Sequence, residues 1–125
     1  MIAAETQIAE ERGAVVTKAL LRAAALLGLS ARRLAGVIGA SEPTVSRMKA
    51  GTYRLDPASK PYELAVLLIR VFRSLDAIAG GDGAVIRQWM ANDNQALGGR
   101  PIERIASIEG LMDVLAYLDA RRALV

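Results

Sequence analysis

Residues 29–51 have the sequence LSARRLAGVIGASEPTVSRMKAG, two short amphipathic segments that each begin at a serine and end at a glycine. Ser30 is placed to cap a helix that ends at Gly39, and Ser41 to cap a second helix that ends at Gly51. A helix that enters a DNA groove has to be short, capped and fixed to a scaffold helix by a tight turn. The sequence therefore predicts a helix-turn-helix suited to the major groove of DNA.

The second of these helices divides its side chains between a core face and an outward face. Val45 and Met48 are expected to anchor it, as Leu34, Ala35 and Ile38 anchor the first helix. The outward set is polar or basic, apart from Pro43. We predict a DNA-binding surface made of Arg32, Arg33, Ser41, Glu42, Thr44, Ser46, Arg47, Lys49 and Arg54.

The residue types indicate which of these side chains would contact bases and which would contact phosphates. Arg47 is the candidate for a bidentate contact to guanine, and Glu42 can accept a hydrogen bond from cytosine. The N-terminus at Ser41 suits a phosphate, and Arg32, Arg33, Lys49 and Arg54 are expected to clamp phosphates without reading sequence. The alternative is a three-helix packing unit with a solvated basic face.

Charge is distributed unevenly along the 125 residues. The net charge of +3 divides into −3 over residues 1–11, +7 over residues 12–54 and −1 over the remainder. A local surplus of this size is the electrostatic pattern expected of a nucleic-acid-binding unit.

Composition argues against several classes of function. The chain has no cysteine and no histidine, which removes disulfides, thiolate nucleophiles, the usual zinc ligands and the commonest general base. Asp76, Asp82 and Asp93 form no paired catalytic constellation. No apolar run reaches the roughly 20 residues of a membrane span, and a signal peptide is not evident. We expect a cytoplasmic protein that is not an enzyme and binds no metal, cofactor or membrane.

Helical spacing of Ala, Leu, Ile and Val predicts an all-α fold in three regions. Residues 1–13 form an N-terminal arm, a short acidic helix or frayed end that is broken or bent at Gly13. Residues 14–60 form the helix-turn-helix region, and residues 61–125 a region for dimerisation and partner binding. Within the last, a helix over 61–79 has an apolar face wide enough for a central buried helix or a dimer interface. A final helix from Ser107 is expected to bury Ile108, Leu111, Met112, Leu115 and Leu118.

A second motif lies in the C-terminal half. It comprises Trp89, Asn94, Leu97, Gly98, Gly99, Arg100, Pro101 and Gly110. The paired glycines allow a sharp reversal, Pro101 fixes the next turn, and Trp89 is expected to plug the core where a small helix docks. Neither this loop nor Gly80–Gly83 has the residues of a phosphate-binding P-loop.

The two motifs together resemble a known family. The first resembles the Xre-type repressor helix-turn-helix, and the second resembles the toxin-binding domain of the Xre/MbcA/ParS antitoxins. The resemblance implies an antitoxin that blocks the active site of a RES-domain toxin, which consumes NAD or transfers its ADP-ribose. It also implies a homodimer that represses its own operon by binding operator DNA. The alternative is a stand-alone Xre-type regulator whose C-terminal half dimerises or senses a ligand.

The C-terminal tail suits the role of an inhibitor segment. A mobile end with two arginines and an apolar tip has the chemistry to enter a cleft made for the phosphates of a dinucleotide. We therefore expect Arg121, Arg122, Leu124 and Val125 to contact the toxin. The competing interpretation is an ordinary solvated helix end, where cations are favoured by the helix dipole.

Overall fold

A computed structural model describes residues 2–124, which contain seven α-helices, one 3₁₀ turn and no strand. The helices are α1 (Ile2–Leu27), α2 (Ala31–Ile38), α3 (Glu42–Ala50), α4 (Lys60–Ala79), α5 (Gly83–Ala91), α6 (Pro101–Arg104) and α7 (Ile108–Arg122). The 3₁₀ turn η1 (Gln95–Leu97) lies between α5 and α6. The predicted all-α fold is confirmed.

The helix ends follow from local side-chain chemistry. The hydroxyls of Ser30, Ser41, Ser59 and Ser107 each accept a hydrogen bond from the backbone amide three residues later, at the start of α2, α3, α4 and α7. Gly39 and Gly51 close α2 and α3 in the left-handed conformation, with φ of 70° and 78°. These caps confirm the predicted helix-turn-helix boundaries.

The predicted break at Gly13 is wrong, because α1 runs without interruption from Ile2 to Leu27. Gly13 is buried where the loop after α3 crosses the helix, and a Cβ atom there would collide with the carbonyl oxygen of Leu55. Thr17 ties the two segments together, since its hydroxyl donates to the Gly13 carbonyl (2.6 Å) and accepts from the Leu55 amide (2.9 Å). The glycine therefore permits a close approach and does not end the helix.

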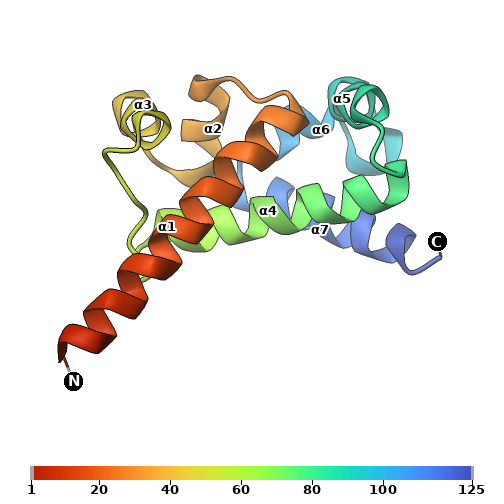
Figure 1. The fold of residues 1–125 in the computed structure, drawn as a ribbon. Coiled ribbons are helices and arrows are strands. Elements are labelled where there is room, and N and C mark those ends of the chain that lie inside the picture. The colour runs from red at the N-terminus through yellow and green to blue at the C-terminus, as the bar shows by residue number, and fades with distance from the viewer. Residues whose placement is uncertain (1, 125) are drawn as a thin grey trace.

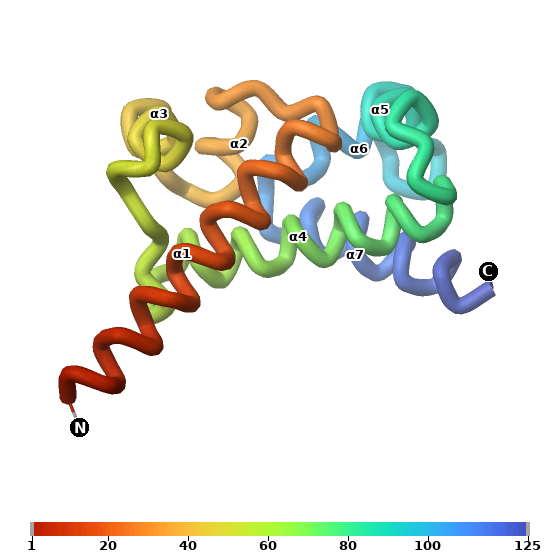
Figure 2. The backbone as a smooth tube through the Cα atoms, viewed as in Figure 1, coloured from red at the N-terminus to blue at the C-terminus, as the bar shows by residue number. Residues whose placement is uncertain are grey.

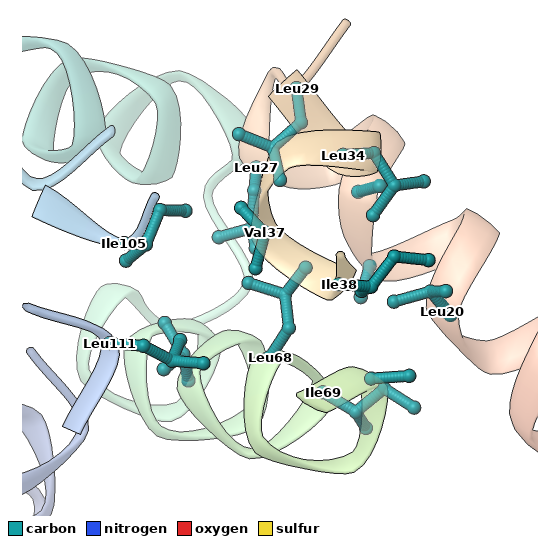
Figure 3. Packing of buried hydrophobic residues seen from close by; sticks show 14 of the residues in the cluster. Leu20, Leu27, Leu29, Leu34, Val37, Ile38, Leu68, Ile69, Ile105 and Leu111 are labelled. Carbon is teal, nitrogen blue, oxygen red and sulfur yellow. The ribbon is translucent and has the colours of Figure 1, made fainter. Parts of the chain in front are cut away.

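Helix α4 lies at the centre of the molecule (Figure 1). It packs against α1, α2, α5 and α7. Figure 3 shows Leu68 of α4 between Val37 of α2, Leu111 of α7 and Leu20 of α1. One hydrophobic cluster runs through all of these helices. Of the two explanations offered for the wide apolar face of α4, the structure supports the buried central helix.

The last helix buries a narrower face than predicted. Leu111, Leu115 and Leu118 are buried together with Val114, but Ile108 and Met112 are 61% and 45% exposed. Ile108 occupies the first turn, and Met112 lies beyond the edge of the face that meets α4. The apolar side chains of α7 therefore spread over a wider part of the helix surface than the rest of the protein covers.

Candidate nucleic-acid and protein interfaces

Helix α3 presents its polar side chains to solvent, as predicted. Ser41, Glu42, Ser46, Arg47 and Lys49 are exposed, and Thr44 is half-buried. Val45 and Met48 are buried and hold the helix against the core. One whole side of this short capped helix is therefore open to solvent. The major groove of DNA is wide enough to admit such a helix.

Three of these side chains form a line along the helix. The hydroxyls of Ser41 and Thr44 are 2.9 Å apart, and Nη2 of Arg47 donates to Oγ1 of Thr44 at 3.1 Å. Ser41 also accepts from the Thr44 amide at 3.2 Å. The Arg47 guanidinium is therefore held along the helix, with its other donors available. Sequence reasoning placed all three residues on the surface but did not foresee that they bond to one another.

The predicted phosphate-clamping residues are all exposed but do not form one cluster. Arg32 and Arg33 line a hollow on α2 whose opposite wall is Ile102 and Ala106. Arg54 and Lys18 of α1 line a separate hollow near the C-terminal end of α3. Within residues 2–124, no ion pair engages any of the predicted DNA-contacting cations. Their charge is therefore available to phosphates.

The C-terminal motif builds a tight reversal between α5 and α6. Asn94 and Gly99 exchange backbone hydrogen bonds of 3.1 and 3.2 Å, and the Asn94 side chain accepts from the Leu97 amide at 3.2 Å. Gly98 has a φ of 71°, which a side chain would strain. In the structure, Asn94, Gly98 and Gly99 shape this reversal.

Gly110 allows α6 and α7 to touch. A Cβ atom on Gly110 would collide with the backbone carbonyl of Arg104, at the end of α6. An ion pair of 2.7 Å between Arg104 and Asp113 also joins α6 to α7, and a second pair of 3.4 Å between Arg100 and Glu103 lies within the first turn of α6. Pro101 is buried at the start of α6.

Trp89 is half-buried at the rim of the core, while Ile86 and Met90 on the same helix are buried completely. The Trp89 ring stacks on Tyr117 of α7 with centroids 6.2 Å apart, and the Arg121 guanidinium lies 4.7 Å from the centre of the Tyr117 ring. A row of Trp, Tyr and Arg thus joins α5 to the end of α7. Sequence reasoning missed Tyr117, because no local signal near it indicates a partner as distant in the chain as Trp89.

The C-terminal tail is mostly an extension of α7, which runs to Arg122. Asp119 fixes it to α4, because one carboxylate oxygen accepts from the buried Ser74 hydroxyl at 2.7 Å and the other lies 3.5 Å from Arg70. Arg121, Arg122 and Leu124 are exposed, and Leu124 is 88% exposed. Val125, the fourth predicted toxin-contacting residue, lies outside the described residues.

Two other classes of site find no support in the part of the chain that the structure describes. Residues 2–124 contain no cluster of acidic side chains able to hold a metal ion. None of the helices formed by those residues is both long enough and apolar enough to cross a membrane.

Comparison with family models covers nearly the whole chain. The model of the antitoxin Xre-like helix-turn-helix domain matches residues 6–70. The model of the antitoxin Xre/MbcA/ParS C-terminal toxin-binding domain matches residues 74–123. A search of curated proteins gave no significant match. The two matched regions meet inside α4, so both use the central helix.

Proposed function

The chain belongs to the Xre/MbcA/ParS-type antitoxins, and on that basis we propose that it inhibits a cognate RES-domain toxin by occluding the toxin's active site and represses its own operon. The observation that carries this proposal is the succession of an Xre-like helix-turn-helix and a toxin-binding domain on one chain. The protein acts by binding and not by catalysis. Operator DNA and toxin would both be met in the cytoplasm.

DNA binding is proposed to occur through a symmetric homodimer that presents two copies of α3 to a palindromic operator. The exposed surface of α3 and the unpaired cations around it, within the described residues, support this part of the proposal. Arg47 would read a base, while Arg33 would neutralise a phosphate.

The DNA-binding proposal is tested by titrating wild type and variants onto the DNA upstream of the gene. Arg47→Ala should reduce the ratio of operator to non-operator affinity. Arg33→Ala should weaken binding to all sequences and lower the salt dependence by roughly one ion. Arg87→Ala, which removes an exposed charge on α5, is the matched control. Operator binding that both α2 and α3 variants leave unchanged would refute the assignment of this surface.

Toxin inhibition is proposed to use the exposed end of α7, where Arg121 and Arg122 would meet polar groups of the toxin cleft and Leu124 would add apolar contact. The exposed pair Ile108 and Met112 on the same helix is the competing surface. Because Asp119 holds α7 on α4, truncation should begin after it to leave the fold intact.

This second proposal is tested by co-expressing antitoxin variants with the neighbouring RES-type gene and measuring growth, cellular NAD and the size of the purified complex. Arg121→Glu with Arg122→Glu, or deletion of residues 123–125, should release toxin activity, while Met112→Asp should not. If the tail variants neutralise the toxin fully and Met112→Asp fails, the contact lies on the other surface of α7. If no complex forms with the RES protein, the proposed toxin class is wrong.

A further inference from the structure

Trp89, Tyr117 and Arg121, here called the aromatic row, lie one after another between α5 and the end of α7. The Trp89 and Tyr117 rings stack with 24° between their planes, and the Arg121 guanidinium lies over the Tyr117 ring. Both rings are half-buried, whereas Arg121 is exposed. Figure 2 shows α5 and the end of α7 at the end of the molecule away from α3. The aromatic row is therefore remote from the DNA-binding helix and lies within the region matched to the toxin-binding domain.

The last part of α7 is held from two sides. Its Asp119 accepts a hydrogen bond of 2.7 Å from the buried Ser74 hydroxyl of α4, and its Tyr117 stacks on Trp89 of α5. Both residues lie within about one helical turn of Arg121. The backbone that carries Arg121 is therefore fixed relative to both neighbouring helices.

Arg122, the next residue, differs from Arg121 in how its side chain is held. Successive residues are about 100° apart around a helix, so the two arginines leave α7 in different directions. Within residues 2–124, Arg121 is the one cation that lies over an aromatic ring, and neither arginine forms an ion pair. A free arginine side chain loses conformational entropy when a partner immobilises it, and one already held on a ring loses less. This difference favours Arg121 as the stronger contact.

The contact with Tyr117 leaves the hydrogen-bonding capacity of Arg121 available. A cation over a ring is attracted to the negative face of the ring, and this attraction uses no acceptor atom. The N–H donors of the guanidinium can still bind a carboxylate in a bidentate manner. Trp, Tyr and Arg are also the residue types that contribute most to binding energy in protein interfaces. The aromatic row thus has the chemistry of an interface anchor for an acidic group.

We propose that Arg121 binds a carboxylate of the toxin and that Tyr117, itself held by Trp89, is the positioning residue that fixes the Arg121 guanidinium. This inference rests on the toxin inhibition proposed above and narrows it from the whole tail to one arginine and its support. The Tyr117 ring raises toxin affinity because it reduces the entropy that Arg121 loses on binding. Arg122 and Leu124 lie at the rim of the contact.

The test measures the affinity of full-length variants for the neighbouring RES-type protein by calorimetry. Arg121→Ala should weaken binding on the order of tenfold or more, because a charged hydrogen-bonded contact is lost. Arg122→Ala is the matched control, since it removes the same side chain from the next position, and it should weaken binding by less than about threefold.

The role of Tyr117 is tested by two substitutions whose folding is checked by circular dichroism. Tyr117→Leu removes the ring and should weaken toxin binding about three- to tenfold, the range of a cation–π contact. Tyr117→Phe keeps the ring and should bind within about twofold of wild type. In an Arg121→Ala background, Tyr117→Leu should cause no further loss, because the side chain that it positions is absent.

A spectroscopic measurement examines the aromatic row without changing Tyr117. Trp89 is the one tryptophan of the chain, so the protein labelled with fluorotryptophan gives a single fluorine resonance. In the unbound protein, Arg121→Ala should shift this resonance and Arg122→Ala should leave it unchanged. Addition of toxin to the wild-type protein should also shift it. A resonance that responds to neither Arg121→Ala nor toxin would refute the positioning role.

The remaining outcomes separate this inference from the proposed function. Equal losses with Tyr117→Phe and Tyr117→Leu, or losses that add in the double variant, would refute positioning while leaving toxin binding by the tail intact. A loss with Arg122→Ala as large as that with Arg121→Ala would refute the choice of Arg121. If no variant of the row changes affinity and Met112→Asp abolishes it, both the row and the proposed tail contact are wrong. If the wild-type chain does not bind the RES-type protein, the proposed function itself fails.

Discussion

At the scale of single residues, two buried glycines mark where segments touch through their backbones. At Gly13 and Gly110 an added Cβ would meet a backbone carbonyl, which cannot move aside as a flexible side chain can. Gly36 in α2 differs, since nothing lies within 4 Å of its Cβ position. All three glycines lie inside helices, so sequence spacing alone does not show which of them has a backbone segment packed against it.

Gly110→Ala should therefore lower the free energy of unfolding by about 3 kcal/mol, because α6 and α7 would have to separate. Gly36→Ala should raise it by about 0.5–1 kcal/mol through helix propensity. Urea denaturation followed by circular dichroism measures both changes. Equal effects of the two substitutions would show that the close contact at Gly110 has no energetic weight.

The hydroxyl of Thr44 should act on DNA through Arg47. Thr44→Val removes the 3.1 Å bond to the guanidinium, and we expect operator affinity to fall about three- to tenfold, the usual range for one hydrogen bond. A double-mutant cycle tests this mechanism, because Thr44→Val should cost much less in an Arg47→Ala background. Additive losses would mean that Thr44 contacts DNA by itself.

At the scale of elements, the sequence predicted what local chemistry controls. Serine caps and left-handed glycines set the ends of α2 and α3, and both signals lie within a few residues of the boundary they determine. Two predictions that the structure overturned, the break at Gly13 and the burial of Met112, both depend on contacts between segments that are distant in the chain. The role of Gly13 is to admit the backbone of Leu55, and the exposure of Met112 depends on how far α4 reaches around α7.

In the candidate site, too, features set by local sequence could be predicted and contacts between distant residues could not. The outward residues of α3 could be predicted from helical periodicity. The stacking of Trp89 on Tyr117 and the bond from Ser74 to Asp119 could not, because they join residues 28 and 45 positions apart in the chain. The placement of Arg32 and Arg33 opposite Ile102 was hidden for the same reason.

The attachment of α7 to α4 rests on Asp119. Asp119→Ala should destabilise the fold by about 1–3 kcal/mol, because it leaves the buried Ser74 hydroxyl without an acceptor. Asp119→Asn keeps an acceptor oxygen and loses only the exposed ion pair with Arg70, so its effect should stay below about 1 kcal/mol. Thermal unfolding of the two variants separates these contributions. Equal destabilisation would assign the attachment to charge alone.

At the scale of the whole molecule, α4 belongs to both matched regions and one hydrophobic cluster spans them. We therefore expect a single unfolding transition. Fluorescence of Trp89, which lies in the C-terminal region, and circular dichroism, which reports all the helices, should give the same midpoint in urea. Separate midpoints would mean that the two regions fold independently despite their shared helix.

The shared helix also has a consequence for how long the protein survives in a cell. Proteases cut chains that have opened, and here one opening event would unfold the helix-turn-helix region and the toxin-binding region together. A partner that binds only the folded chain lowers the population of that open state, wherever on the surface it binds. Bound toxin would then extend the lifetime of the helix-turn-helix region, and bound DNA that of the toxin-binding region. Degradation would remove both activities in the same step.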